Sequence, residues 1–112
     1  MVVLSIDVLF DAAIRIQLAE RSISITFAED AIRIKFPTTR RLAEFLEVPH
    51  YYVLPYFAMM EQEELVTRAE RVGVLTTAKG SRKMLALMQE NYAGDMQEII
   101  GKKIFSDLSG KR

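Results

Sequence analysis

The sequence contains no cysteine and a single histidine among its 112 residues. Without cysteine the chain forms neither a disulfide framework nor a thiolate metal site. Its fifteen basic and fifteen acidic residues cancel, so the chain lacks the overall positive charge of many nucleic-acid-binding proteins, which does not exclude a local basic patch. Half of the residues are hydrophobic, which indicates one small domain with enough apolar material for a core.

Long hydrophobic runs are also lacking. The apolar N-terminal stretch, residues 1–18, is interrupted by Asp7, Asp11 and Arg15. Each of these charges would cost about 3 kcal/mol at the centre of a bilayer. The same stretch lacks the basic start and the small-residue cleavage site of a secretory signal. We therefore expect no membrane span, no secretory signal and a cytoplasmic location.

Groups that usually carry catalysis are scarce. His50 stands beside Pro49, and no glycine-rich phosphate loop precedes a predicted helix. A carboxylate cluster at Glu61, Glu63 and Glu64 has no second type of ligand beside it, so it fits a solvated helix end better than a metal or acid–base site. We expect no enzymatic activity, no metal and no cofactor.

The informative part of the sequence is residues 37–80. Apolar residues at helical spacing predict a first helix over about 39–47, started by Pro37 and the two threonines that follow it. Pro49 forms a turn, because proline cannot continue the hydrogen bonding of that helix. A second helix is predicted over about 52–63. Its apolar face consists of Val53, Tyr56, Phe57 and Met60.

Two short runs rich in β-forming residues follow this helix pair. They occupy residues 65–68 and 72–76, on either side of a turn at 69–71. They predict a hairpin that leads into the start of another helix near Gly80.

The order and spacing of these pieces resemble the winged helix-turn-helix of prokaryotic and archaeal regulators. The matching segments are Leu42-Ala43-Glu44, Val48-Pro49, Val53, Glu61 and Leu65-Val66-Thr67-Arg68. Residues 75–80, LTTAKG, are similar to the LTxxG motif that closes the wing in the MarR-like branch. The chain departs from the family at Glu64, where a glycine is usual, and at Pro55, which lies inside the second helix or delays its start by a residue or two.

The resemblance implies a helix ahead of the helix-turn-helix, within residues 5–20. The residues themselves leave two alternatives open. Alternation within 5–8 and 14–18 favours strands, whereas the i,i+4 pair Asp11 and Arg15 and the two alanines between them favour a helix. We expect a helix, because a winged-helix core needs one there.

Residues 22–36 alternate with period two around a turn at 28–31, which predicts an extra β-hairpin. The buried face of this hairpin is expected to consist of Ile23, Ile25, Phe27, Ile32, Ile34 and Phe36. Arg33 and Lys35 would lie on the outer face. They are either an ordinary solvated surface or phosphate contacts beside the two arginines that open the first motif helix.

After the wing, the pattern predicts a helix over about 81–92, a break at Gly94 and a last helix over 96–108. Asp95, with Glu98 three residues later, is typical of helix capping. The last helix carries an apolar stripe of Met96, Ile99, Ile100, Ile104 and Leu108. Because so short a helix is marginal alone in water, we expect this stripe to form a homodimer interface, with packing onto the chain's own first helix as the alternative.

The helix surface expected to face a DNA groove carries no lysine or arginine. It consists of His50, Tyr51, Tyr52, Leu54, Pro55, Ala58, Met59 and Gln62. Duplex binding draws most of its affinity from neutralised phosphates, so a DNA interface here would depend on wing and backbone contacts. The candidate DNA-binding residues are Arg40, Arg41, His50, Tyr51, Tyr52, Arg68, Arg71 and Lys79.

The predicted architecture is an α+β winged helix-turn-helix with an extra N-terminal β-hairpin and a C-terminal helical extension. Residues 1–93 would form the winged-helix domain, with the helix-turn-helix at 38–63 and the wing at 65–77, and residues 94–112 the extension. The resemblance implies a small dimeric transcriptional regulator that binds double-stranded DNA. The alternative is a winged helix that serves protein–protein assembly within a larger complex, which the uncharged recognition helix favours.

Overall fold

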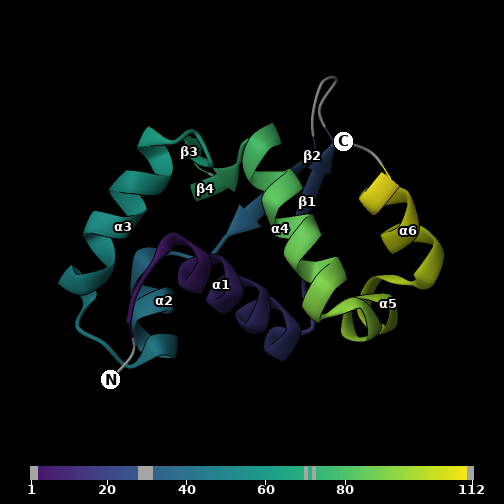
Figure 1. The fold of residues 1–112 in the computed structure, drawn as a ribbon, viewed down its shortest axis with the longest axis horizontal. Helices are drawn as coiled ribbons and strands as arrows, with labels where there is room; N and C mark the ends of the chain where they lie inside the picture. Colours follow the sequence, from purple (N-terminus) through teal and green to yellow (C-terminus); the bar gives the residue numbers. More distant parts are fainter. Residues whose placement is uncertain (1–2, 28–31, 70, 72, 111–112) are drawn as a thin grey trace.

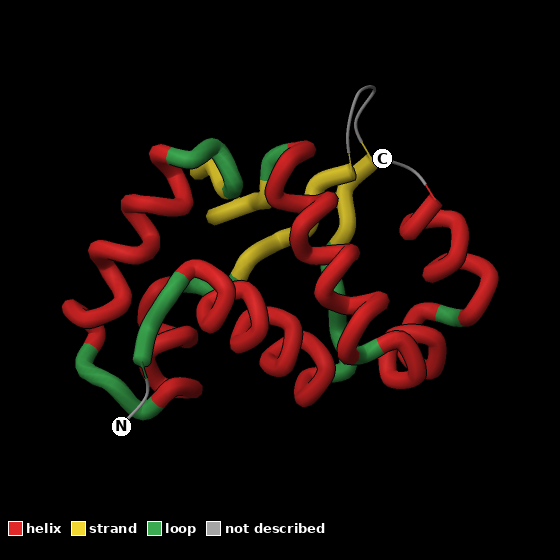
Figure 2. Tube along the Cα trace, in the orientation of Figure 1, coloured by secondary structure: helices red, strands yellow, loops and turns green. Residues whose placement is uncertain are grey.

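A computed structural model describes residues 3–27, 32–69, 71 and 73–110 of the chain. Within these residues, helices pack around an antiparallel sheet (Figure 1, Figure 2). The elements in chain order are α1 (Ile6–Glu20), β1 (Ile25–Phe27), β2 (Ile32–Phe36), α2 (Thr39–Leu46), α3 (His50–Gln62), β3 (Val66–Ala69), β4 (Gly73–Thr76), α4 (Ala78–Asn91), α5 (Ala93–Ile100) and α6 (Lys102–Gly110). The predicted α+β class is confirmed, and the element order is compatible with a winged helix. No helix in the described ranges is long and apolar enough to cross a membrane.

The segment 5–20, for which both a helix and strands were possible, forms the helix α1. Ser5 caps it, since its hydroxyl accepts a hydrogen bond from the Val8 amide at 3.1 Å. Ile14 and Ile16 are both buried because α1 contacts α2, α3, α4 and α5 (Figure 1). A helix covered on several sides needs no single apolar stripe, so alternation along it does not indicate a strand.

The four described strands form one antiparallel sheet in the order β1-β2-β4-β3. β2 pairs with β1, where Ile34 stands opposite Ile25, and also with β4, where Lys35 stands opposite Leu75. The predicted N-terminal hairpin and the predicted wing are therefore continuous, and β2 joins them.

The predicted buried face of the first hairpin is partly wrong. Its buried and half-buried members are Ile34, Phe36, Ile23, Ile25 and Ile32. Phe27, by contrast, is 65% exposed. It ends the three-residue edge strand β1, which pairs with β2 on one side only. The predicted turn at 28–31 lies outside the described residues.

The segment predicted as a helix-turn-helix contains two helices, α2 and α3. Thr38 caps α2 by accepting a hydrogen bond from the Arg41 amide at 3.1 Å. α3 begins at His50, two residues before the predicted start at Tyr52, so the expectation of a later start is wrong. Pro49 occupies the N-cap position with a φ of −59°. Because proline has no backbone N–H, no donor is left without a hydrogen-bond partner at this position.

Both departures from the winged-helix pattern have a physical account. Pro55 lies inside α3, and the amide that it lacks would have bonded the carbonyl of Tyr51, an exposed residue in the first turn. Glu64 takes the place of the usual glycine and has a φ of 61°, in the left-handed region that glycine favours. The Leu65 amide then closes the end of α3 on the Met60 carbonyl at 2.8 Å.

The junction between the wing and α4 is held by buried hydroxyls. The Thr76 hydroxyl accepts a hydrogen bond from the Ile34 amide at 2.9 Å and lies 2.6 Å from the Ser81 hydroxyl. Thr77 caps α4, since its hydroxyl accepts from the Gly80 amide at 3.1 Å. The LTTAKG segment therefore ties β2, β4 and α4 together, and α4 starts three residues earlier than predicted.

The C-terminal region differs from the prediction. The break after α4 is at Tyr92, and Gly94 lies inside α5. Asp95 stands in the first turn of α5 but does not cap it, because the N-cap residue is Tyr92, which makes no side-chain cap bond. The single helix predicted over 96–108 is two helices, α5 and α6, which are separated at Gly101 with a φ of 92°.

The break at Tyr92 coincides with a tertiary hydrogen bond. The Tyr92 hydroxyl donates to Asp11 Oδ1 of α1 at 2.5 Å. Burial, together with this bond, raises the pKa of Tyr92 to about 12. α5 then packs on α1 and α4, and α6 packs on α4 and α5, so that Met96, Phe105 and Leu108 join the same hydrophobic core as the rest of the chain.

Candidate functional site

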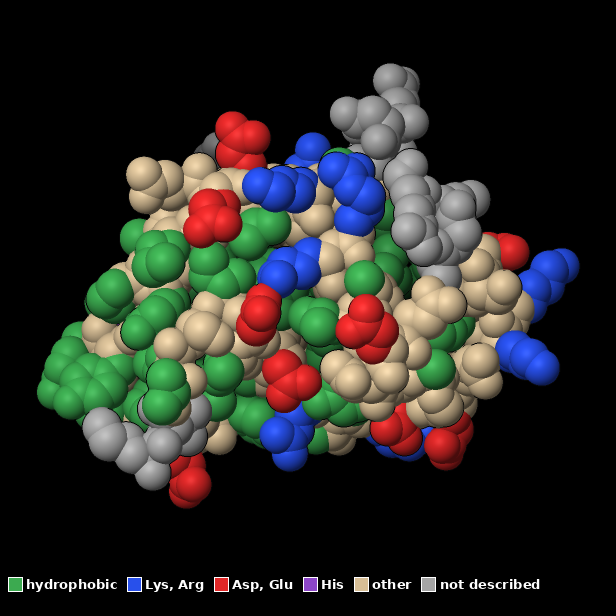
Figure 3. Space-filling model, viewed as in Figure 1, with side chains coloured by type: hydrophobic (Ala, Val, Ile, Leu, Met, Phe, Trp, Pro, Cys, Tyr) green, Lys and Arg blue, Asp and Glu red, His purple; other side chains and the backbone are tan. Residues whose placement is uncertain are grey.

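The outer face of α3 is apolar and uncharged. Tyr51 and Tyr52 at its start are 65% and 45% exposed, and Leu54 and Met59 further along are 43% and 42% exposed. The other exposed members are Pro55, Ala58 and Gln62. Figure 3 shows hydrophobic side chains gathered over this helix. Because contiguous apolar surface marks interaction sites, this face is the main candidate site.

The inner face of α3 fixes the position of the outer one. It is formed by Val53, Tyr56, Phe57 and Met60. At the start of the helix, His50 Nε2 lies 2.7 Å from Thr39 Oγ1, and this hydrogen bond links α3 to the first turn of α2. The rings of Tyr51 and Tyr52 meet edge to face with centroids 4.8 Å apart, so the two exposed rings form one unit.

Arg41, a predicted DNA contact, is bonded within the chain. Its Nε and Nη2 donate to Glu20 Oε2 at 3.2 and 2.5 Å. The hydrogen bond with Glu20, and the charge of that carboxylate, raise the pKa of Arg41. The charge of Arg41 is therefore balanced by α1.

Two further predicted contacts are also bonded within the chain. Arg68 Nε and Nη2 each lie 3.3 Å from a carboxylate oxygen of Glu61. Lys79 Nζ donates to the backbone carbonyl of Glu63 at 3.0 Å. Exposed pairs of this kind are worth about 0–1 kcal/mol, so a phosphate group competes with them at little cost.

Among the basic residues predicted to contact DNA, Arg40 and Arg71 are the two whose side chains are not bonded to another described residue. Arg40 is exposed in the first turn of α2, and Arg71 is exposed between β3 and β4 with a φ of 67°. In the described part of the chain, neither side chain forms a hydrogen bond or an ion pair.

The predicted contacts fall into two groups at opposite ends of α3. The aromatic group, with His50, Tyr51 and Tyr52, is at the start of the helix. Arg68 and Lys79 are bonded near its end. Thirteen helical residues separate the two ends by about 20 Å. Arg68 and Lys79 are thus set apart from the aromatic surface, whereas Arg40 directly follows Thr39, whose hydroxyl is bonded to His50.

The residues predicted to form a dimer interface do not share one exposed face. Met96 and Leu108 are 1% and 2% exposed and pack in the chain's own core. Ile99 and Ile100 are half-buried, and only Ile104, at 54%, is largely exposed. The turn at Gly101 rotates α6 away from the line of α5, which divides the stripe.

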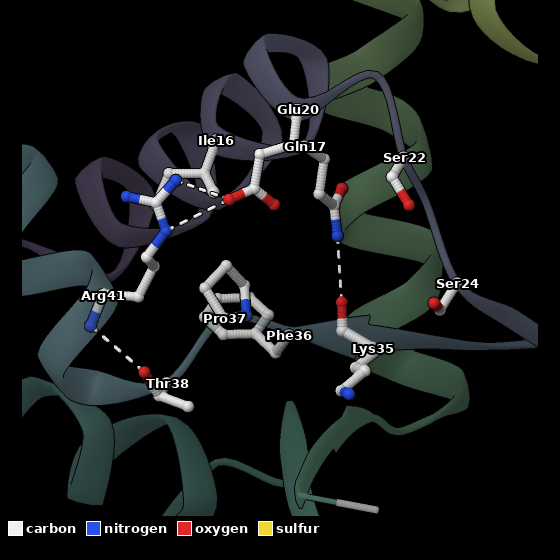
Figure 4. Close-up of a pocket in the computed structure, with 10 residues that line it drawn as sticks. All are labelled: Ile16, Gln17, Glu20, Ser22, Ser24, Lys35, Phe36, Pro37, Thr38 and Arg41. Carbon is white, nitrogen blue, oxygen red and sulfur yellow. Dashed lines mark hydrogen bonds and ion pairs between the residues drawn. The ribbon is translucent and has the colours of Figure 1, made fainter.

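A cleft that the sequence did not reveal lies between the end of α1, the end of β2 and the start of α2 (Figure 4). Its volume is about 380 Å³. Gln17 lines it and is 6% exposed. The signal in the sequence is a single amide side chain, Gln17, between the hydrophobic residues Ile16 and Leu18.

Comparison with known proteins provides no family for the chain. No protein-family model matches it, and no curated protein matches it at a significant level. The functional argument therefore depends on the geometry described above and on the winged-helix pattern in the sequence.

Proposed function

We propose that this chain is a winged-helix module that docks onto another protein through α3. The observation that carries the proposal is the outer face of α3, which exposes two tyrosines, a leucine and a methionine and includes no charged residue between His50 and Met60. Tyrosine and methionine are enriched at the centres of protein interfaces, whereas charged residues are depleted there.

The winged-helix part of this proposal is supported by topology. A helix precedes the helix-turn-helix, and a β-hairpin follows it and pairs with a strand that comes earlier in the chain. In this arrangement α3 takes the position of a recognition helix. Winged helices present that helix to different kinds of partner, so the side chains on it decide the function.

The partner is expected to present an apolar centre with a basic rim. Glu47 is exposed just before α3, and Glu63 and Glu64 are exposed just after it. The candidate surface is therefore apolar in the middle, with an acidic side chain before its start and Glu63 and Glu64 beside Arg68 and Lys79 at its end. Lysines or arginines around a leucine- or phenylalanine-rich segment of the partner would complement it.

Double-stranded DNA is the second candidate, favoured by one observation. Arg40 and Arg71 are exposed and unpaired within the described residues, and the bonds of Arg68 and Lys79 are of the weak, exposed kind. These side chains would contact phosphates while α3 contributes no basic group to base recognition.

The two candidates are separated with two double variants of the full chain. The helix variant, Tyr52→Ala with Met59→Ala, removes two large exposed side chains from the apolar outer face of α3. The wing variant, Arg68→Ala with Arg71→Ala, removes two cations. Both alter exposed residues, so each is expected to change the free energy of unfolding by less than about 1 kcal/mol.

Each variant and the wild type are used to capture proteins from a nuclease-treated lysate of the source cells, and each is titrated against random duplex DNA over a salt series. We expect a protein captured by the wild type and the wing variant to bind the helix variant at least tenfold more weakly, because central aromatic side chains dominate interfaces. Salt-dependent DNA binding whose slope falls by about two in the wing variant would instead support the DNA candidate. A capture that is equal for all three proteins would contradict docking through α3.

A further inference from the structure

The cleft beside α1 contains a buried hydrogen-bond acceptor, Gln17 Oε1, that no other described residue satisfies. Gln17 Nε2 donates to the Lys35 backbone carbonyl at 2.9 Å, which fixes the orientation of the amide. Gln17 Oε1 is buried and has no hydrogen-bond partner among the residues that the structure describes. Figure 4 shows this oxygen turned away from Lys35, on the side of Ser22. A buried acceptor without a donor is costly, so a donor supplied from outside the chain would bind favourably there.

The neighbouring side chains add one group of each charge. Glu20 lies one helical turn after Gln17, and its Oε2 accepts both bonds from Arg41. Among the described residues Glu20 Oε1 and Arg41 Nη1 form no hydrogen bond. The ion pair of Glu20 and Arg41 at the cleft therefore offers a free carboxylate oxygen on its Gln17 side and a free guanidinium N–H at its other end (Figure 4).

The start of α2 lies at the same cleft. Thr38, its N-cap residue, lines the opening. The first-turn amides of a helix carry a partial positive charge and favour carboxylates. The floor is apolar, with Ile16, Phe36 and Pro37 beneath the polar wall. A volume of about 380 Å³ lies within the range of small-molecule sites.

We propose that this cleft binds an aliphatic α-amino acid. The ammonium group of the ligand donates to Gln17 Oε1 and Glu20 Oε1. Its carboxylate accepts from Arg41 and from the first turn of α2, and its side chain lies on the apolar floor. Residues 22–24 have no regular structure, and Ser22 and Ser24 are exposed. Access of the ammonium group to Gln17 requires a shift of this short segment, whose backbone is held by the Ser22 amide bonding the Gln17 carbonyl at 3.1 Å and the Lys35 amide bonding the Ser24 carbonyl at 2.9 Å. The inference does not depend on the function proposed for α3.

The test uses the full chain labelled with ¹⁵N and L-leucine as the probe. The side-chain amide signals of Gln17 are identified by their loss in Gln17→Leu. On titration with L-leucine we expect saturable shifts of these signals and of the Arg41 Nε signal. N-acetyl-L-leucine, which lacks the ammonium group, and L-leucine amide, which lacks the carboxylate, should each bind at least tenfold more weakly, because each loses a charged hydrogen bond.

Two variants locate the site. Gln17→Leu should weaken L-leucine binding at least tenfold, whereas Gln97→Leu, the same change at an exposed position of α5, should leave it unchanged. Ser24→Leu fills the cleft from an exposed position and should also abolish binding, so the test stays decisive if Gln17→Leu does not fold. Failure of L-leucine to shift the Gln17 signals, equal binding of all three probes, or binding that survives Ser24→Leu would each overturn the proposal.

Discussion

At the scale of single residues, two glycines show how the same residue type takes opposite roles. Gly80 lies in the first turn of α4, and a Cβ built on it would stand 1.8 Å from the Leu65 carbonyl oxygen. That carbonyl is held in place, because it accepts a hydrogen bond from the Thr77 amide at 3.0 Å. Gly94 lies in α5 with no atom within 4 Å of its Cβ position. Gly80 is therefore required by close packing, and Gly94 is not.

Gly80→Ala is expected to destabilise the protein by about 2–4 kcal/mol, because backbone atoms must move to admit the methyl group. Gly94→Ala is the matched control and is expected to stabilise by about 0.5–1 kcal/mol, the usual gain for this change inside an exposed helix. Urea unfolding of the two variants and the wild type measures both differences. Equal stability of Gly80→Ala and the wild type would show that the junction between the wing and α4 is looser than described.

Ion pairs between different elements were not predictable from the sequence, although the character of α3 and the local i,i+4 pair of Asp11 and Arg15 were. The lack of lysine and arginine on α3 is a local property of thirteen consecutive residues. The bond between Arg41 and Glu20 joins positions twenty-one apart in different helices, and no local spacing indicates it. The unpartnered acceptor of Gln17 depends in the same way on a carbonyl eighteen residues away.

At the scale of elements, prediction succeeded where the signals are local. Thr38 and Pro49 mark the starts of α2 and α3, and alternating residues mark the strand β2. The break after α4 was misplaced at Gly94, because glycine is a common breaker but the actual break occurs at Tyr92. The Tyr92 hydroxyl bonds Asp11, eighty-one residues earlier, and such a contact leaves no trace in local periodicity.

The Tyr92–Asp11 bond predicts a pH dependence at alkaline pH. The pKa of Tyr92 is raised from 10.0 to about 12 in the folded chain, so the protonated phenol is favoured by folding. The stability contributed by this group is therefore fully present below about pH 10 and is lost as the pH rises toward 12. Below pH 10 we expect Tyr92→Phe to be less stable than the wild type by about 1–2 kcal/mol, with the difference shrinking above it.

Two measurements test the hydrogen bond between Tyr92 and Asp11. The difference between the tyrosinate absorbance titrations of the wild type and Tyr92→Phe should have a midpoint near pH 12. Urea unfolding at a series of pH values should show the stability difference falling over the same interval. A difference titration centred at 10.0, the ordinary value, would mean that neither the burial of Tyr92 nor its bond to Asp11 persists in solution.

At the scale of the whole molecule, the C-terminal helices complete the core instead of extending from it. α5 and α6 together provide Met96, Phe105 and Leu108 to the core that also contains Phe10 of α1 and Met84 of α4. The sequence showed an apolar stripe but not what would cover it, because the turn at Gly101 decides which side of α6 faces α4. The apolar surface left on α5 and α6 is therefore much smaller than the five-residue stripe suggested.

This packing changes what is expected of the oligomeric state. Of the five residues in the predicted dimer stripe, Met96 and Leu108 are already buried, so a dimer would have only Ile104 and the exposed parts of Ile99 and Ile100 of that stripe to bury. We expect sedimentation equilibrium to give the monomer mass of 12.8 kDa, and Ile104→Glu to leave both the mass and the stability unchanged within about 0.5 kcal/mol. Ile100→Glu is expected to destabilise the monomer, because Ile100 is half-buried and packs against the core. A wild-type dimer that Ile104→Glu converts into a folded monomer would restore the homodimer interface predicted from the sequence.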